Sequence, residues 1–152
     1  MTDTPSVEAF VAPERGPHIL RSKEDAARFV EEIMRLTPPD DPQLALLYAI
    51  APGGMNKHGR PNHEFGVGFD SSRGRCSLSY SGPEPAGTWF SLDQSESESD
   101  VTEYAYFGEP AERPANSSIT TADTVEAICE FLATEGKRPT KVNWQLKPDP
   151  VA

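Results

Sequence analysis

The chain has 152 residues, a length typical of one domain, and combines a hydrophobic fraction of 36% with a formal net charge of −10. Nucleic acid and anionic membranes bind basic surfaces, so this charge argues against both as direct partners and favours a basic protein partner. The first residues lack the basic and apolar segments of a signal peptide, and no apolar run is long enough to span a bilayer, so we expect a cytoplasmic protein.

The chain is expected to begin with an irregular segment and then a helix. Residues 1–16 show no periodic pattern and are predicted to be a loose lead-in. A helix should start at Ser22, because Ser22 and Asp25 have the spacing of a capping box and apolar residues follow at helical intervals. It should end near Leu36, since the prolines of the following TPPDDP segment cannot continue a helix.

Strands are predicted for the middle of the chain. Leu44–Ala51 is an apolar run between turn residues and reads as a buried strand. Alternating residues on both sides of the turn SSRG predict a hairpin of Glu64–Asp70 and Arg75–Ser81. Further strand patterns occur at Gly87–Leu92 and Val101–Phe107.

The last elements are predicted to be a helix and a strand. The helix runs from about Ala122 to Glu135, with Thr121 as its cap and Gly136 placed for a left-handed terminus. The strand is Lys141–Leu146, where apolar and polar residues alternate.

These elements predict a single α+β domain over residues 17–148, followed by a short tail at 149–152. Consecutive strands joined by short turns imply a mainly antiparallel sheet of about five to six strands, with the two helices packed on it.

Several motifs of the sequence lack residues that a catalytic or metal site would need. Gly66 and Gly68 lack the third glycine of a phosphate loop, and are expected to let another segment approach the strand closely. His58 and His63 are expected to be exposed loop residues without further zinc ligands nearby. The two cysteines, at positions 76 and 129, lie among apolar residues and are expected to be buried free thiols.

The charge distribution is uneven along the chain. From Cys76 to Glu112 there is no Lys, Arg or His. The carboxylates of this region are Glu84, Asp93, Glu96, Glu98, Asp100, Glu103, Glu109 and Glu112. One interpretation is a solvated acidic loop without a binding role. The other is a surface for a positively charged partner.

Several segments occur in an order typical of a known family. They are Phe65–Phe69, Leu78–Tyr80, Trp89, Val125–Leu132, Gly136–Pro139 and Val142–Gln145. In this order the chain has a short glycine-rich strand, a strand ending in Tyr, a strand with Trp, and a helix that leads through Gly-x-Arg-Pro to a second Trp strand. This order resembles the first-described family of immunity proteins from bacterial polymorphic-toxin systems. The resemblance extends over about Gln43 to Gln145.

The resemblance implies an α+β fold, a gene beside a toxin gene, and no enzymatic activity, cofactor or metal. It also implies a one-to-one complex with a cognate toxin domain in the cytoplasm, in which the toxin's active site is closed. The toxins of this family are often deaminases that act on DNA or other nucleic acid, and less often nucleases.

The residues fit this expectation, because a toxin that acts on nucleic acid needs a basic groove and its inhibitor should carry the opposite charge. We predict that acidic residues steer the toxin and that three aromatic residues anchor it. The acidic set is Asp93, Glu96, Glu98, Asp100 and Glu103, and the aromatic set is Trp89, Tyr104 and Tyr106. Strand alternation is expected to bury Phe107 and to place both tyrosines nearer the surface.

Two functions of other classes remain as alternatives. A general binding module or secretion chaperone would bind its partner and leave the partner's activity intact. A small hydrolase would use carboxylates of the segment Asp93–Glu103 as acid and base, and would lose turnover when those carboxylates are neutralised.

Overall fold

The structure is a computed structural model and describes residues 5–11, 17–83, 85–93, 101–106 and 108–147. The fold is α+β, as predicted, but its sheet has ten strands rather than five to six. The helices are α1 (Lys23–Leu36) and α2 (Thr121–Ala133). The strands are β1 (Ser6–Phe10), β2 (His18–Leu20), β3 (Gln43–Ile50), β4 (Glu64–Asp70), β5 (Arg75–Ser81), β6 (Thr88–Leu92), β7 (Val101–Tyr106), β8 (Glu109–Pro114), β9 (Ser118–Thr120) and β10 (Asn143–Leu146).

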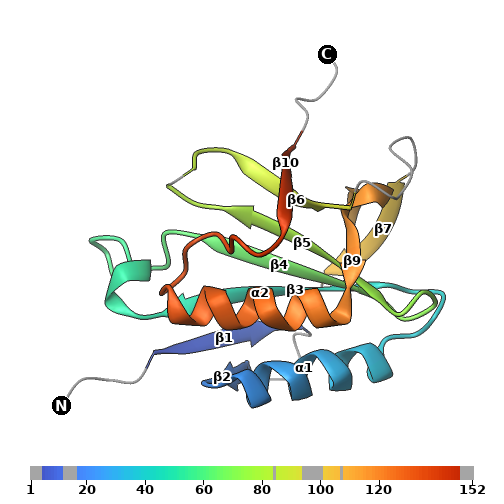
Figure 1. The fold of residues 1–152 in the computed structure, drawn as a ribbon, viewed down its shortest axis with the longest axis horizontal. Helices are drawn as coiled ribbons and strands as arrows, with labels where there is room; N and C mark the ends of the chain where they lie inside the picture. The colour runs from blue at the N-terminus through green and yellow to red at the C-terminus, as the bar shows by residue number, and fades with distance from the viewer. Residues whose placement is uncertain (1–4, 12–16, 84, 94–100, 107, 148–152) are drawn as a thin grey trace.

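The main path of the sheet has the order β10-β6-β5-β4-β3-β1-β2, and its neighbours pair antiparallel (Figure 1). The predicted β4–β5 hairpin is confirmed over its full length. Strand β9 pairs with the start of β5. Strands β7 and β8 form a separate hairpin, which joins the sheet through one parallel pair between Gln43 and Ala105.

Both helices start with a side-chain cap. Ser22 Oγ accepts a hydrogen bond from the Asp25 backbone N–H at 3.1 Å, as the capping pattern predicts. At α2 the cap is Thr120, one residue earlier than predicted. The helix also ends two residues short of Glu135, because Glu135 and Gly136 adopt positive φ angles of 58° and 99°.

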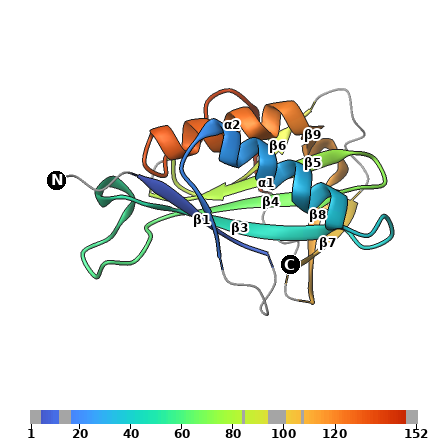
Figure 2. The same cartoon turned by 90° about the horizontal axis from the view of Figure 1, so that it is seen from below.

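The hydrophobic core lies between the two helices and one face of the sheet (Figure 2). On β4 this face carries Phe65, Val67 and Phe69, none of which is exposed to solvent. Phe131 of α2 packs on Phe65, and Phe29 of α1 packs on Phe69. Each of these side chains stabilises the fold by about 1.5–3 kcal/mol through the removal of apolar surface from water.

The two cysteines differ in their surroundings. Cys76 is buried in the core as predicted, whereas Cys129 on α2 is partly exposed, and both are free thiols.

The opposite face of β4 has glycines where the first face has large side chains. A Cβ atom on Gly68 would lie 2.7 Å from the Tyr104 ring, and one on Gly66 would lie 2.6 Å from the Arg113 guanidinium. The predicted close approach at these glycines is therefore confirmed, and the approaching segment is the β7–β8 hairpin. Figure 2 shows β7 on the side of the sheet away from the helices.

Four strands, namely β1, β2, β8 and β9, lie outside the predicted set. Strand β1 falls within the expected lead-in, yet it pairs along its whole length with β3 and contributes the fully buried Val7 and Ala9 to the core. Strand β8 contains Pro110 and Pro114, which is compatible with a strand only because β8 pairs with β7 alone.

Candidate partner-binding surface

Part of the sheet remains open on the face opposite the helices. On β1 and β3, every second residue points to this face, because the residues between them are in the core. Glu8 lies opposite Tyr48, and Phe10 lies opposite Leu46. The Tyr48 hydroxyl donates a hydrogen bond of 3.0 Å to the exposed carboxylate of Glu64 on β4.

Two further aromatic residues, Phe10 and Tyr106, lie near the residues of this hydrogen bond. Phe10 meets Tyr48 edge to face, with 6.1 Å between ring centroids. Burial, followed by the negative charge of Glu64, raises the pKa of Tyr106 at the end of β7. The same two causes raise the pKa of Tyr48 far above its ordinary value. Both phenols therefore stay protonated at neutral pH, and the Tyr48 proton is held by Glu64.

The outer side of the β7–β8 hairpin is acidic. Glu103 and Glu112 are exposed and lie directly opposite each other in the strand register. Like charges in this arrangement destabilise a sheet, so folding does not explain the pair. Val101, on the same side of the hairpin, is 63% exposed, and Glu109 is exposed opposite Tyr106.

We call this region the acidic-aromatic surface. Its residues are Glu8, Phe10, Tyr48, Glu64, Val101, Glu103, Tyr106, Glu109 and Glu112. It has partly exposed aromatic side chains beside Glu64 and a separate pair of carboxylates, Glu103 and Glu112, on the outer side of the hairpin. Aromatic and acidic side chains are the composition expected for binding a basic protein surface.

Arg113 is a basic residue of strand β8, and it is only 4% exposed. Its guanidinium donates hydrogen bonds of 2.6 Å to the Ser77 carbonyl and to Ser79 Oγ, and it lies over the rings of Phe90 and Tyr104. Burial lowers the pKa of Arg113 to about 10, so it is still charged at neutral pH. Its charge is held beneath the hairpin and is not presented to a partner.

The structure places two of the predicted site residues at the surface of the hairpin, on opposite sides of β7. Glu103 is exposed on the hairpin, and Tyr106 is partly exposed beside Glu64. Tyr104 was expected nearer the surface, and this is wrong, because it is only 3% exposed. Its ring fills the space above Gly68, and burial raises its pKa to about 12.

The other predicted residues lie elsewhere. Asp93 forms an ion pair of 2.8 Å with Arg75, so the cation-free stretch of sequence is not free of cations in space. Trp89 pairs across strands with Tyr80, whose side chain points into the core, so Trp89 belongs to the helix side of the sheet. The positions 96, 98, 100 and 107 lie outside the described residues.

Phe10 and Tyr48 are surface residues that were not predicted from the sequence. Phe10 lay in the expected lead-in, and Tyr48 lay in a run that was read as buried on both faces. The available signal was the alternation in QLALLYAI, where the small residues Ala45 and Ala49 face the helices and Tyr48 faces the other way.

His63 is not the exposed loop residue that was expected. It is 6% exposed, and its Nε2 accepts a hydrogen bond of 2.9 Å from the backbone N–H of Ala49. Among the described residues there is no group of three or more His, Cys, Asp or Glu side chains that could hold a metal ion. In the same part of the chain, the helices are too short or too polar to cross a membrane.

The family model described as Immunity protein Imm1 matches residues 14–146, which include every helix and all strands except β1. None of the curated proteins with which the chain was compared matches it.

Proposed function

Because the chain belongs to the Imm1 family of immunity proteins, which act against toxins, we propose that it neutralises one cognate toxin by binding it in a one-to-one complex. We propose further that the toxin domain is basic and acts on nucleic acid, in particular as a DNA cytidine deaminase, and that binding takes place in the cytoplasm. In this proposal the chain works by occlusion and has no catalytic role of its own.

The single observation that carries the binding mode is the acidic-aromatic surface. A deaminase that holds a nucleic acid strand needs a positively charged groove for the phosphates. Carboxylates on the outer side of the hairpin and on β1 and β4 present the opposite charge to such a groove. The attraction acts over roughly 8 Å at physiological salt and increases the rate of encounter.

Slow release requires contacts other than exposed ion pairs, which are worth little in water. Tyr48, Tyr106 and Phe10 supply them in this proposal, because aromatic side chains on rigid strands lose little conformational freedom when they become buried. Tyr104 acts from beneath, by holding the hairpin on the sheet. A basic nuclease toxin would fit the same surface, so the identity of the neighbouring gene product decides between the two chemistries.

The test is to mix the chain with the toxin domain encoded beside it and to measure both binding and toxin activity. We expect a stable one-to-one complex without toxin activity. A complex that keeps full toxin activity would instead support a chaperone or general binding module. Absence of a complex at micromolar concentration in low salt would overturn the proposal.

Two variants locate the surface. The double change Tyr48→Ala with Tyr106→Ala should weaken binding on the order of 100-fold, mainly through faster dissociation. Glu32→Ala on the exposed side of α1 is the matched control and should leave affinity within about 3-fold of the parent. Equal effects of the surface and control variants would show that the toxin binds elsewhere.

A further inference from the structure

Arg138 lies between the only two tryptophans of the chain. Its guanidinium carbon is 4.8 Å from the ring centroid of Trp89 on β6 and 5.6 Å from that of Trp144 on β10. Such contacts between a cation and an indole face are attractive and orient the flat guanidinium group. The sequence analysis placed Trp89 among the anchor residues, and the structure places it in this cluster, separate from the acidic-aromatic surface.

The segment that carries Arg138 is fixed at both ends by side-chain donors, one buried and one partly buried. The Tyr80 hydroxyl donates to the carbonyl of Gly136 at 2.6 Å, and Trp144 Nε1 donates to the carbonyl of Pro139 at 2.7 Å. Gly136 and Pro139 are themselves buried. The position of Arg138 is therefore set before any partner arrives, which lowers the entropy lost on binding.

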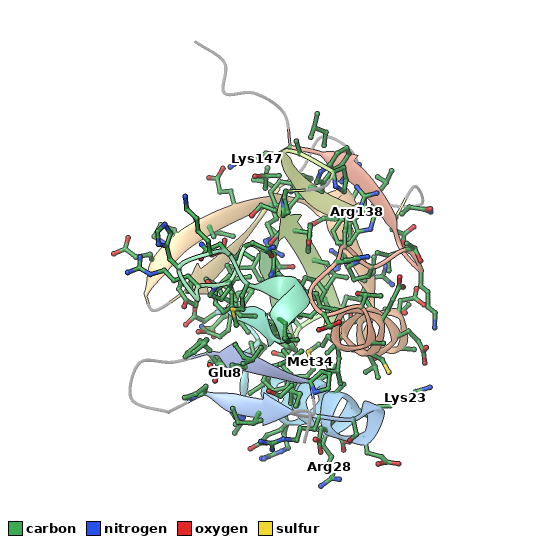
Figure 3. All side chains as sticks on the ribbon, turned by 90° about the vertical axis from the view of Figure 1, so that its left-hand side faces the viewer. Glu8, Lys23, Arg28, Met34, Arg138 and Lys147 are labelled. Carbon is green, nitrogen blue, oxygen red and sulfur yellow. The ribbon has the colours of Figure 1, made fainter. Side chains whose placement is uncertain are left out.

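The guanidinium of Arg138 has no hydrogen bond or ion pair with any residue in the described part of the chain; it lies over the two indole rings, and its charge also acts on the Tyr80 phenol. Its N–H donors are consequently available at the edge of the group. Lys137 and Lys147 are exposed in the same region, and Leu146 is 56% exposed. Figure 3 shows Arg138 and Lys147 in the part of the molecule away from α1, which carries Lys23 and Arg28.

We propose that Arg138 binds a carboxylate of the toxin domain, an Asp or Glu side chain, at a second contact site on the β6–β10 side of the sheet. This inference rests on the proposed function. A guanidinium offers two parallel N–H donors that match the two oxygens of a carboxylate. A nucleic acid phosphate would offer similar oxygens, but the net charge of −10 opposes its approach.

The location has a consequence for the geometry of the complex. The acidic-aromatic surface is on the face opposite the helices, whereas Trp89 is on the face of Tyr80 and the core. A toxin that reaches both sites extends around the β6–β10 end of the sheet. Arg and Trp are also the residue types most enriched among side chains that dominate binding energy.

The experiment compares three variants in complex formation with the toxin domain encoded beside the chain. Arg138→Lys keeps a cation between the rings but removes the paired donors, and we expect it to weaken binding on the order of 10-fold. Arg138→Ala should weaken binding on the order of 100-fold. Lys137→Ala removes the same charge from the neighbouring exposed position and should change affinity by less than about 3-fold.

A purely structural role would give a different pattern. If Arg138 only ties its segment to β6 and β10, Arg138→Lys should lower thermal stability and leave the affinity of the folded protein equal to that of Lys137→Ala. Circular dichroism melts of each variant separate the two effects. Equal affinities of Arg138→Lys and Lys137→Ala would overturn the carboxylate proposal.

The tryptophans provide a second readout. With 5-fluorotryptophan incorporated, the chain should give two ¹⁹F signals, both from this site, and both should shift when unlabelled toxin domain is added. Neutralising the toxin's surface Asp and Glu residues one at a time should identify one whose effect is not additive with Arg138→Lys. A complex that forms without either response would overturn the second site but leave the proposed function standing, whereas no complex at all would overturn both.

Discussion

Gly68 gives the clearest case in which a single residue determines what can lie above the sheet. The Tyr104 ring occupies the space that a side chain at position 68 would fill, with a Cβ distance of 2.7 Å. The ring belongs to strand β7 and cannot move without moving the hairpin. The glycine is therefore required by packing rather than by backbone conformation.

We predict that Gly68→Ala lowers the free energy of unfolding by about 1–3 kcal/mol, because the added methyl group collides with the Tyr104 ring. Urea denaturation measures the change. Gly53→Ala is the control, since its Cβ would meet its nearest neighbour at an ordinary 3.5 Å. In the background Tyr104→Ala, the Gly68→Ala change should have little effect, and an equally large loss there would contradict the packing explanation.

His63 has a polar role within the core. Its Nε2 accepts from Ala49, its Nδ1 lies 3.0 Å from Asn62 Oδ1, and its ring packs edge to face on Phe131 at 5.2 Å. An acceptor at Nε2 requires the neutral ring with its proton on Nδ1. Burial lowers the pKa of His63 below its ordinary value of 6.5.

This lowered pKa predicts a loss of stability in mild acid. The unfolded chain takes up the proton at higher pH than the folded chain does, so the contribution of His63 is complete above pH 6.5 and declines as the pH falls below it. Urea denaturation between pH 7.5 and 5 should show the decline. His63→Gln should flatten this profile, while His58→Gln, at an exposed position, should leave it unchanged.

At the scale of elements, the β7–β8 hairpin is joined to the rest of the sheet by few backbone contacts and mainly by side chains. Its parallel pairing with β3 consists of one residue pair, supported by the hydrogen bond of 2.8 Å from the Ala105 N–H to the Pro42 carbonyl. Tyr104 and Arg113 supply the remaining attachment through their contacts with β4 and β5.

We predict that Glu103→Lys stabilises the protein by about 0.2–1 kcal/mol while slowing its association with the toxin. The change replaces a repulsive pair with an attractive one across the hairpin, and it removes negative charge from the acidic-aromatic surface. Thermal unfolding and stopped-flow binding measure the two effects. If stability rises and the association rate is unaffected, the hairpin carboxylates do not steer the partner.

The elements recovered from the sequence are those with a strong local pattern. Strands β4 and β5 have the predicted bounds, because their alternation is regular and their connection is short. Strands β2 and β9 have three residues each, too few for a periodic signal, and the five residues of β1 lie in a segment that was read as an irregular lead-in. These short strands exist because neighbouring strands are already in place, and such long-range pairing leaves little trace in a local pattern.

At the scale of the whole molecule, the charge of −10 is distributed unevenly. The acidic-aromatic surface exposes carboxylates, while exposed cations such as Lys137 and Lys147 lie near the β6–β10 end. A partner therefore meets different electrostatic surroundings at the two sites. The long-range electrostatic attraction of a basic partner should be governed by the acidic-aromatic surface, which is larger and negatively charged.

We predict that the association rate constant with the toxin domain falls by about 10-fold or more between 50 mM and 500 mM NaCl, while the dissociation rate changes much less. Screening weakens the attraction that acts before contact, but the buried aromatic contacts persist once formed. Stopped-flow measurements across this range provide the check. A salt-independent association rate would contradict an encounter driven by charge.

The acidic character of the acidic-aromatic surface was easier to predict from the sequence than the identity of the residues that form it. Net charge and the cation-free stretch indicated an acidic surface, and of the predicted site residues Glu103 is exposed and Tyr106 is partly exposed, while their role in binding stays a prediction. Tyr104 was misplaced because its burial depends on Gly68, which is distant in sequence. Tyr48 and Glu64 come together only through the pairing of β3 with β4, which no local pattern specifies.

In the β7–β8 hairpin, the side chains that attach it to the sheet differ from those that it exposes on its outer side. Tyr104 and Arg113 on its underside hold it to the glycine positions of β4, whereas Glu103 and Glu112 on its upper side take no part in that attachment. In the proposed complex these outer residues face the toxin, so they can change one at a time when the toxin changes. Tyr104 and Arg113 keep the hairpin attached during such changes, so binding specificity can evolve while the fold stays the same.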